Sequence, residues 1–305
     1  MHFFSARCPA KINLFLKLTG RRDDGYHELE SLFAFLDLAD ELTVKKNDEF
    51  KLEITGEFAP FLDPKKNLFT EILDFFATEF GITKNLHIKI KKNIPVGAGL
   101  GGGSSDAAFF MQGLNKIFSL NLSKEKLQEI SLRFGSDIAF FFEDRASLVK
   151  GRGEVIENFS DFEPITALLV NPRISLSTKE VFEKFDGMPR GVMPLDVMLS
   201  SACPEPVEGS KHDSGTKRHE SCFDKLSMTS MLENFPNDLT RSAIAMLPII
   251  SGILAELKNS GAEIAKMSGS GASCFGIFSD EKKLDEAAKK FPEFFVKKVK
   301  ILSHV

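Results

Sequence analysis

The stretch PVGAGLGGGSSDAA at residues 95–108 decides the fold prediction, because five of its fourteen residues are glycine. Glycine loses more freedom on folding than any other residue, so such a cluster indicates positive φ angles or close approach of the backbone to another group. Upstream, LHIKI at 86–90 alternates apolar and polar residues and predicts a strand. Downstream, the Ser-Ser-Asp sequence at 104–106 offers helix N-caps, and residues 107–114 predict a mostly buried helix.

A strand, a glycine loop and a helix start together can bind phosphate, because unpaired N–H groups and the positive end of the helix dipole meet there. The alternative is a structural loop or a flexible linker. Linkers usually lack ordered flanks, whereas Val96, Ala98 and Leu100 interleave with the glycines here. The loop lacks the Gly-Lys-Ser/Thr ending of a P-loop and the following acidic residue of a dinucleotide fingerprint. We therefore predict a phosphate site of another type, made by Pro95, Val96, Gly97, Ala98, Gly99, Leu100, Gly101, Gly102, Gly103, Ser104 and Ser105.

The composition is that of an ordinary globular protein. The chain has 305 residues, 43% hydrophobic and 27% charged, which is enough for two domains with cores. A net charge of -4 gives no support to nucleic-acid or membrane binding. The four cysteines are scattered without metal spacing, which favours a reducing, cytoplasmic location. No apolar run reaches the roughly 18 residues that a membrane span needs.

The rest of the chain alternates strand and helix patterns. Residues 8–18 predict a strand with Lys11 and Asn13 on one face. Other predicted strands are 29–38, 42–54, 165–171 and two within 262–278. Predicted helices are 67–80, 123–134, 178–185, 240–258 with an interruption at Pro248, and 281–291. This order predicts two α+β domains, 1–155 and 156–305, and the polar, aperiodic residues 200–222 predict a disordered insertion or surface loop.

Three stretches together resemble the three motifs of the GHMP kinase superfamily. They are PAKINL at 9–14 followed by Gly-Tyr-His at 25–27, the glycine loop, and MSGSGAS at 267–273. The first stretch narrows the resemblance to members that phosphorylate 4-diphosphocytidyl-2-C-methyl-D-erythritol. The resemblance implies an N-terminal domain with a ribosomal-S5-domain-2-like fold and a ferredoxin-like C-terminal domain. It also implies ATP along the glycine loop, Mg²⁺ bridging its phosphates, and the small-molecule substrate between the domains.

The resemblance implies a catalytic pair as well. The stretch GSDIAFF at 135–141 matches the family segment that carries the general base, so Asp137 is the candidate, with Ala139 in place of the family's proline. Lys11 matches the active-site lysine, whose ammonium would keep the aspartate ionised and attract phosphate charge. The alternatives are that Asp137 caps a helix or turn and that Lys11 is a solvated strand lysine.

The substrate residues follow from the same match. Asn13 would bond the erythritol, Tyr26 and Phe182 would stack on the cytosine, and His27 would read its polar edge. Thr178 would also touch the substrate. Because the chain contains 30 Phe, simple core packing is the competing interpretation of Phe182.

Two further positions, Asn67 and Lys92, align with residues near the adenosine of ATP. The sequence names no metal ligand and is compatible with a monomer or a homodimer. Competing functions are another GHMP kinase acting on mevalonate or homoserine, a non-catalytic ligand-binding relative, and an S5-like RNA-binding module. The intact Lys11 and Asp137 argue against the second, and the net charge gives no support to the third.

Overall fold

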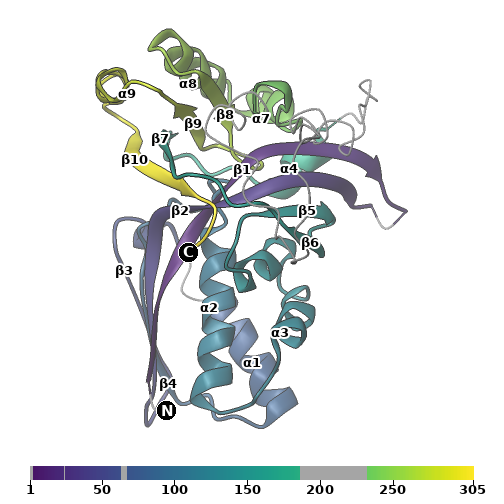
Figure 1. Ribbon diagram of the computed structural model, residues 1–305. Helices are drawn as coiled ribbons and strands as arrows, with labels where there is room; N and C mark the ends of the chain where they lie inside the picture. Colours follow the sequence, from purple (N-terminus) through teal and green to yellow (C-terminus); the bar gives the residue numbers. More distant parts are fainter. Residues whose placement is uncertain (1–2, 24, 63–66, 186–231) are drawn as a thin grey trace, which may run out of the picture.

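A long hairpin of two strands, β1 (Phe3–Arg21) and β2 (His27–Lys46), runs through the fold and links its two halves. The structure, a computed structural model, describes residues 3–23, 25–62, 67–185 and 232–305. The insertion predicted at 200–222 lies outside these residues. Figure 1 shows the hairpin crossing the molecule, with its turn projecting to one side.

The described strands form one sheet. Its path runs β3-β4-β2-β10-β7-β9-β8, and β1, β5 and β6 are joined through β2 and β5. The strands besides the hairpin are β3 (Lys51–Thr55), β4 (Leu86–Lys91), β5 (Ser147–Gly151), β6 (Val155–Asn158), β7 (Ile165–Asn171), β8 (Ile264–Met267), β9 (Cys274–Ile277) and β10 (Phe295–Leu302). Strand β10 joins the halves because Ile301 pairs with Leu36 of β2 and with Ile165 of β7.

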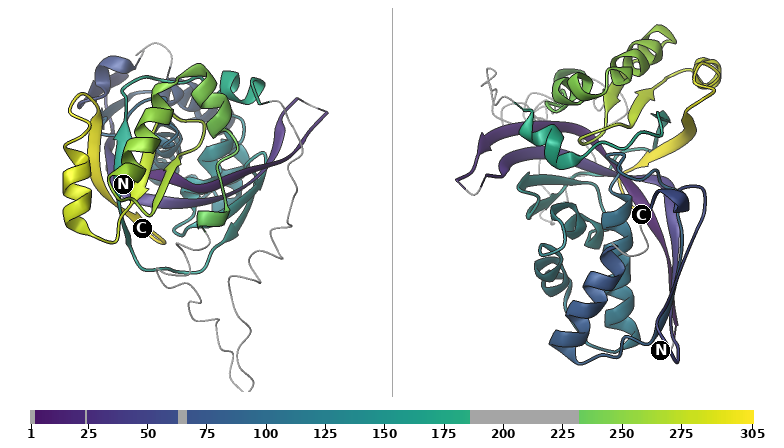
Figure 2. Two further views of the ribbon diagram at one scale, coloured as in Figure 1. Left: turned by 90° about the horizontal axis from the view of Figure 1, so that it is seen from above. Right: turned by 180° about the vertical axis from the view of Figure 1, so that it is seen from behind.

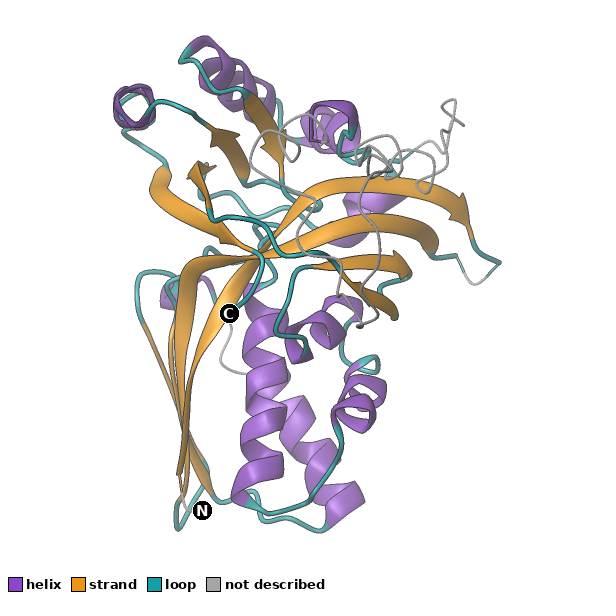
Figure 3. Cartoon of the chain, in the orientation of Figure 1, coloured by secondary structure: helices purple, strands orange, loops and turns teal. Residues whose placement is uncertain are grey.

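Helices cover the N-terminal half of this sheet. They are α1 (Leu68–Phe80), α2 (Gly102–Ile117) and α3 (Lys124–Ser131), with the short 3₁₀ helices η1 (Ala59–Phe61) and η2 (Ser136–Phe142). Figures 1 and 3 show α1 and α2 side by side next to the lower part of the sheet. Phenylalanine fills the core between them; the rings of Phe35 on β2 and Phe140 on η2 stack at 4.6 Å. Burial of such rings is the main favourable contribution to folding here.

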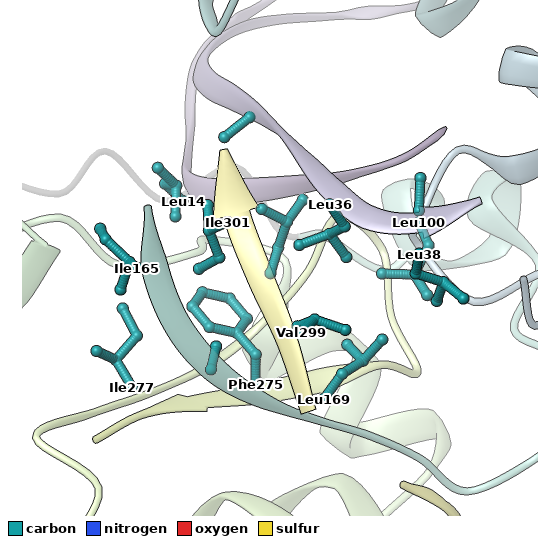
Figure 4. Close-up of a cluster of buried hydrophobic side chains, with 14 of the residues drawn as sticks. Leu14, Leu36, Leu38, Leu100, Ile165, Leu169, Phe275, Ile277, Val299 and Ile301 are labelled. Carbon is teal, nitrogen blue, oxygen red and sulfur yellow. The ribbon is translucent and has the colours of Figure 1, made fainter. Parts of the chain in front are cut away.

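A second set of helices lies beside the C-terminal strands. They are α4 (Thr178–Glu183), α7 (Thr240–Met246), α8 (Ile249–Asn259) and α9 (Glu281–Ala288). Figure 2 shows α8 and α9 at the end of the molecule away from α1. Between the two sets lies a shared core, in which Leu36, Leu169, Phe275 and Ile301 come from four different strands (Figure 4). The boundary predicted at residue 155 stays a prediction, since one sheet and one core run through both halves.

Several predicted elements are confirmed at their ends. Helix α3 starts after Ser123, whose hydroxyl accepts the N–H of Lys126 as an N-cap does. The interruption predicted at Pro248 separates α7 from α8. The strand predicted at 165–171 is β7.

The prediction of separate strands at 29–38 and 42–54 is wrong. Residues 27–46 form the continuous strand β2, and a short strand, β3, follows it. The predicted gap contains Asp40, a residue that usually marks a turn. Here Asp40 is fully buried and bonded to Lys92, so that a tertiary ion pair replaces the solvent exposure that a turn would give it.

Candidate active site

Strand β1 carries Lys11 and Asn13 into the interior. Both are buried, and the Lys11 ammonium donates to Asn13 Oδ1 at 2.5 Å. Asn13 Nδ2 donates in turn to Ser31 Oγ on β2 at 2.8 Å. The register of β1 against β2 shifts on both sides of this pair, and such irregularities re-aim side chains next to functional sites. The interpretation of Lys11 as a solvated strand lysine is therefore wrong.

Asp137 lies opposite Lys11, at the start of η2. Its Oδ2 is 3.3 Å from the Lys11 Nζ, and the lysine also lies over the Phe33 ring, 4.3 Å from its centroid. The helix is preceded by Gly135 and has no side-chain cap, which removes the interpretation of Asp137 as a cap. The carboxylate side chain is 38% exposed while the lysine is buried. A substrate hydroxyl can therefore reach the carboxylate from the solvent side.

The glycine loop begins α2 directly above this pair. The Lys11 N–H donates to Leu100 O at 2.9 Å. Gly101 is the helix N-cap, with φ 66°, and a Cβ there would lie 2.8 Å from Lys11 Cγ. The prediction of an N-cap among residues 104–106 is wrong, because α2 already starts at Gly102.

No side chain caps α2. The first N–H groups of a helix have no partner within the helix, and they carry the positive end of its dipole. Gly103 is exposed, and a Cβ there would meet nothing within 4 Å. This open, uncapped helix start, adjacent to the Lys11 ammonium, is suited to an anion such as phosphate.

The third stretch, around residues 267–273, packs onto the glycine loop. Ser268 Oγ donates to Gly99 O at 2.9 Å and accepts the N–H of Asn13 at 3.2 Å. A Cβ at Gly99, where φ is 74°, would lie 2.1 Å from Ser268 O, so only glycine fits this contact. Residues 9–14 of the first stretch, the glycine loop and the third stretch thus meet at one place.

Lys92, predicted near the adenosine of ATP, is not exposed. Only 3% of it is accessible, and its ammonium bonds to the carboxylates of Asp40 and Asp106. Burial lowers the pKa of Lys92, but the two carboxylates outweigh this and raise it overall. Burial raises the pKa of Asp106 to about 7 against the lowering by the lysine. Lys92, which directly follows β4, therefore links β2 and α2 through buried ion pairs with Asp40 and Asp106.

Asn67, the other position predicted near adenosine, has a local structural role. It is the N-cap of α1, and its Oδ1 accepts the N–H of Thr70 at 3.1 Å. Such a cap contributes about 1 kcal/mol. A contact with nucleotide stays a prediction for this residue.

The Tyr26 and His27 pair lies at the far end of the hairpin. Tyr26 is 54% exposed, and the Arg152 guanidinium lies 4.5 Å from the centroid of its ring. The His27 ring is 5.5 Å from Phe182 and 5.7 Å from Phe185, centroid to centroid. Burial lowers the pKa of His27, and nearby Arg21 lowers it further. A neutral imidazole offers one donor and one acceptor, which suits the edge of a nucleobase.

Helix α4 carries Thr178 and Phe182. Thr178 contacts the third stretch, and Phe182 contacts His27. Thr178 Oγ1 is 2.9 Å from Ser270 Oγ in the third stretch. Phe182 is half-buried; one side packs on the C-terminal core and the His27 ring lies against it. Core packing thus accounts for part of its environment, and stacking on cytosine stays a prediction.

Asn237 positions the third stretch, although no sequence motif marks it as a site residue. Asn237 is buried, and its Nδ2 donates to Met267 O at 2.9 Å and Gly269 O at 2.7 Å. Its backbone also bridges to Leu16 of β1. The only signal in the sequence is Asn after Pro236, a combination that usually marks a turn.

The described part of the chain holds no cluster of three or more His, Cys, Asp or Glu able to bind a metal ion. None of the helices in the described ranges is long and apolar enough to cross a bilayer. The two described cysteines, Cys8 and Cys274, are buried thiols whose pKa values burial raises.

The chain is similar to known GHMP kinases over nearly its whole length. The models for the GHMP kinases N terminal domain and the GHMP kinases C terminal region match residues 67–144 and 225–297. A 4-diphosphocytidyl-2-C-methyl-D-erythritol kinase of Macrococcus caseolyticus is 37% identical over 90% of this chain and 90% of its own length. The Parvibaculum lavamentivorans kinase of the same name is 34% identical over 92% of this chain and 90% of its own length.

Solved structures agree in fold. A crystal structure of 4-(cytidine 5'-diphospho)-2C-methyl-D-erythritol kinase covers 97% of this chain and 99% of its own, with 25% identity and a TM-score of 0.71. A mevalonate kinase of L. major, at 15% identity and a TM-score of 0.69 over 99% of this chain and 97% of its own, shares the fold alone. Because the Macrococcus caseolyticus and Parvibaculum lavamentivorans relatives are more than 30% identical over nearly the whole chain and both GHMP kinase models match it, the chain belongs to the 4-diphosphocytidyl-2-C-methyl-D-erythritol kinase family of GHMP kinases, which are ATP-dependent small-molecule kinases.

Proposed function

We propose that this chain transfers the γ-phosphoryl group of ATP to the 2-hydroxyl of 4-diphosphocytidyl-2-C-methyl-D-erythritol, a step in isoprenoid precursor synthesis. The observation that carries the proposal is the 3.3 Å pair of Lys11 and Asp137 beside the uncapped start of α2. Relatives of that name, matched over nearly the whole chain, support the choice of substrate.

The proposal gives each group a role. Phosphoryl transfer requires alignment and charge neutralisation more than covalent help. The N–H groups at the start of α2 bind phosphate oxygens, and the Lys11 ammonium offsets charge that develops during transfer. Asp137 accepts the proton of the acceptor hydroxyl as the new P–O bond forms, a role that contributes about 10²–10⁴-fold in rate. Asn13 fixes the direction of the ammonium.

Magnesium would enter with the nucleotide. Mg²⁺ is usually held by one or two carboxylates, substrate phosphates and water, and needs no complete protein cage. The Asp137 carboxylate, which is partly exposed beside the helix start, is a ligand of this kind. The Asp137 carboxylate would help to hold the ion, whose positive charge would neutralise charge on the phosphates.

The nucleobase end of the substrate would lie at the tip of the hairpin. Tyr26 offers an exposed ring, and His27 is held against Phe182 and Phe185 with a lowered pKa. Stacking of a base on an aromatic ring contributes about 1–3 kcal/mol. An acceptor without a nucleobase, such as mevalonate or homoserine, has no base that could stack on these rings.

The test is ADP release by the purified protein with Mg²⁺ and ATP. The cytidine-bearing substrate, mevalonate and homoserine are offered separately. Release with the first alone supports the proposal, and release with another alcohol keeps the kinase mechanism but removes the nucleobase assignment. If the protein binds ATP but turns over none of the three, the kinase assignment for this chain fails and a ligand-binding role replaces it.

A further inference from the structure

The turn between β5 and β6 brings an arginine to the substrate region. Gly151 and Gly153 both have positive φ, 72° and 123°, and they flank Arg152. The Arg152 N–H donates to Glu154 Oε2 at 2.5 Å, which closes the turn. Gly151 pairs with Leu29 of β2, two residues after His27. The turn is therefore fixed beside the predicted nucleobase end, and Figure 1 shows β5 and β6 alongside the hairpin.

The Arg152 side chain lies on the surface that would receive the substrate. Its guanidinium is centred 4.5 Å from the Tyr26 ring centroid, and Tyr26 itself is 54% exposed. The five N–H donors of an arginine point outward in the plane of its guanidinium. When the guanidinium stacks on an aromatic ring, these donors therefore remain available for bidentate hydrogen bonds to an anion. Within the described residues, no carboxylate lies within ion-pair distance of this guanidinium; Glu154 is close, but its carboxylate faces the Arg152 N–H and the Arg22 side chain.

The turn between β5 and β6 also lies close to the segment that carries Asp137, the candidate base. A Cβ at Gly153 would lie 3.0 Å from the carbonyl oxygen of Ser136, the residue before Asp137. Only glycine with this φ allows the turn to approach the Asp137 backbone so closely. The turn that carries Arg152 therefore lies against the segment that carries the candidate base, while the Arg152 side chain lies over Tyr26.

We propose that Arg152 binds the diphosphate of the cytidine-bearing substrate. The inference rests on the proposed function and adds a residue to it. In a cytidine-diphosphate alcohol, the two phosphates lie between the base and the alcohol. The Arg152 guanidinium lies over the Tyr26 ring, and the backbone of the next residue, Gly153, lies against Ser136, which precedes Asp137. Its planar fork of donors matches two phosphate oxygens, which Lys matches less well.

The test compares binding of 4-diphosphocytidyl-2-C-methyl-D-erythritol with binding of cytidine, which lacks the phosphates, by isothermal titration. Arg152→Met is expected to weaken binding of the diphosphate substrate by about tenfold to a hundredfold, the effect of losing hydrogen bonds to a charged group. Binding of cytidine should change less than about threefold, because stacking and edge contacts persist. Arg152→Lys should restore part of the affinity, since the charge returns without the fork.

Kinetics give a second readout and a control. The KM for the cytidine substrate should rise in Arg152→Met while the KM for ATP stays unchanged, which also shows that the variant is folded. The matched control is Lys46→Met at the opposite end of β2, where the lysine lies over the Phe118 ring at 4.8 Å. It removes the same charge and the same type of ring contact, and neither KM should change.

Three outcomes decide the matter. Selective loss of affinity for the diphosphate substrate supports the inference. Equal loss for substrate and cytidine overturns it and makes Arg152 a support for the Tyr26 ring. Unchanged binding of both also overturns it. If the wild-type protein neither binds nor phosphorylates the cytidine substrate, the proposed function itself fails, which is distinct from a wild type that is active beside an unaffected variant.

Discussion

Replacing Lys92 by Met should destabilise the protein without weakening ATP binding by the molecules that remain folded. The methionine keeps the apolar stem but removes the ammonium from between two carboxylates that are 0% (Asp40) and 4% (Asp106) exposed. Removing one partner of a buried ion pair costs about 3–5 kcal/mol, because the remaining charge has neither water nor a counterion. That is a large share of a total stability of about 5–15 kcal/mol.

The loss should depend on pH. The Asp106 pKa is raised from 3.8 to about 7 in the folded state. A raised folded pKa means that the native state binds the extra proton, so this contribution to stability is present below about pH 4 and is lost as pH rises through about 7. Without the lysine the pKa rises further, so Lys92→Met should be less destabilised at pH 5 than at pH 8. Lys92→Met with Asp106→Asn should recover part of the loss.

Urea unfolding followed by far-UV circular dichroism is the assay, because the chain has no Trp and one Tyr. The midpoint shift at constant slope gives the change in free energy. Lys91→Met is the matched control, because its ion pair with Glu41 is exposed to solvent and should contribute far less to stability. The reasoning is refuted if Lys92→Met changes stability by less than its control. A raised KM for ATP at unchanged stability would return Lys92 to the nucleotide site.

Further predictions concern the catalytic pair, the nucleobase end and the third stretch. Asp137→Asn should lower kcat by about 10²-fold or more at nearly unchanged KM, and near-normal turnover would remove Asp137 from the mechanism. Tyr26→Ala should raise the KM for the cytidine substrate more than it lowers kcat, whereas an unchanged KM would contradict base stacking on this ring. Asn237→Ala should destabilise the protein by about 1–3 kcal/mol in urea unfolding, because the buried carbonyls of Met267 and Gly269 lose their donor; an unchanged midpoint would count against this role.

Local sequence patterns determined much of the fold. Apolar periodicity located α1 and β7, the cap at Ser123 located α3, and Pro248 separated α7 from α8. These features depend on nearest neighbours along the chain, such as side-chain caps and the missing N–H of proline. The glycine cluster likewise predicted an anion site, since the backbone demands of its glycines are local.

Only the tertiary structure decided which polar residues meet. Asp40, Lys92 and Asp106 are 52 and 14 residues apart along the chain, and no local pattern marks them as one buried cluster. The sequence match placed Lys92 near the adenosine of ATP, but no local pattern indicated that its side chain is buried in the protein core. The contact of Arg152 with Tyr26 depends on the pairing of β5 with β2. The sequence alone thus determined the local backbone and the chemistry it can offer, whereas burial and charge pairing came from contacts between distant segments, where desolvation outweighs local preference.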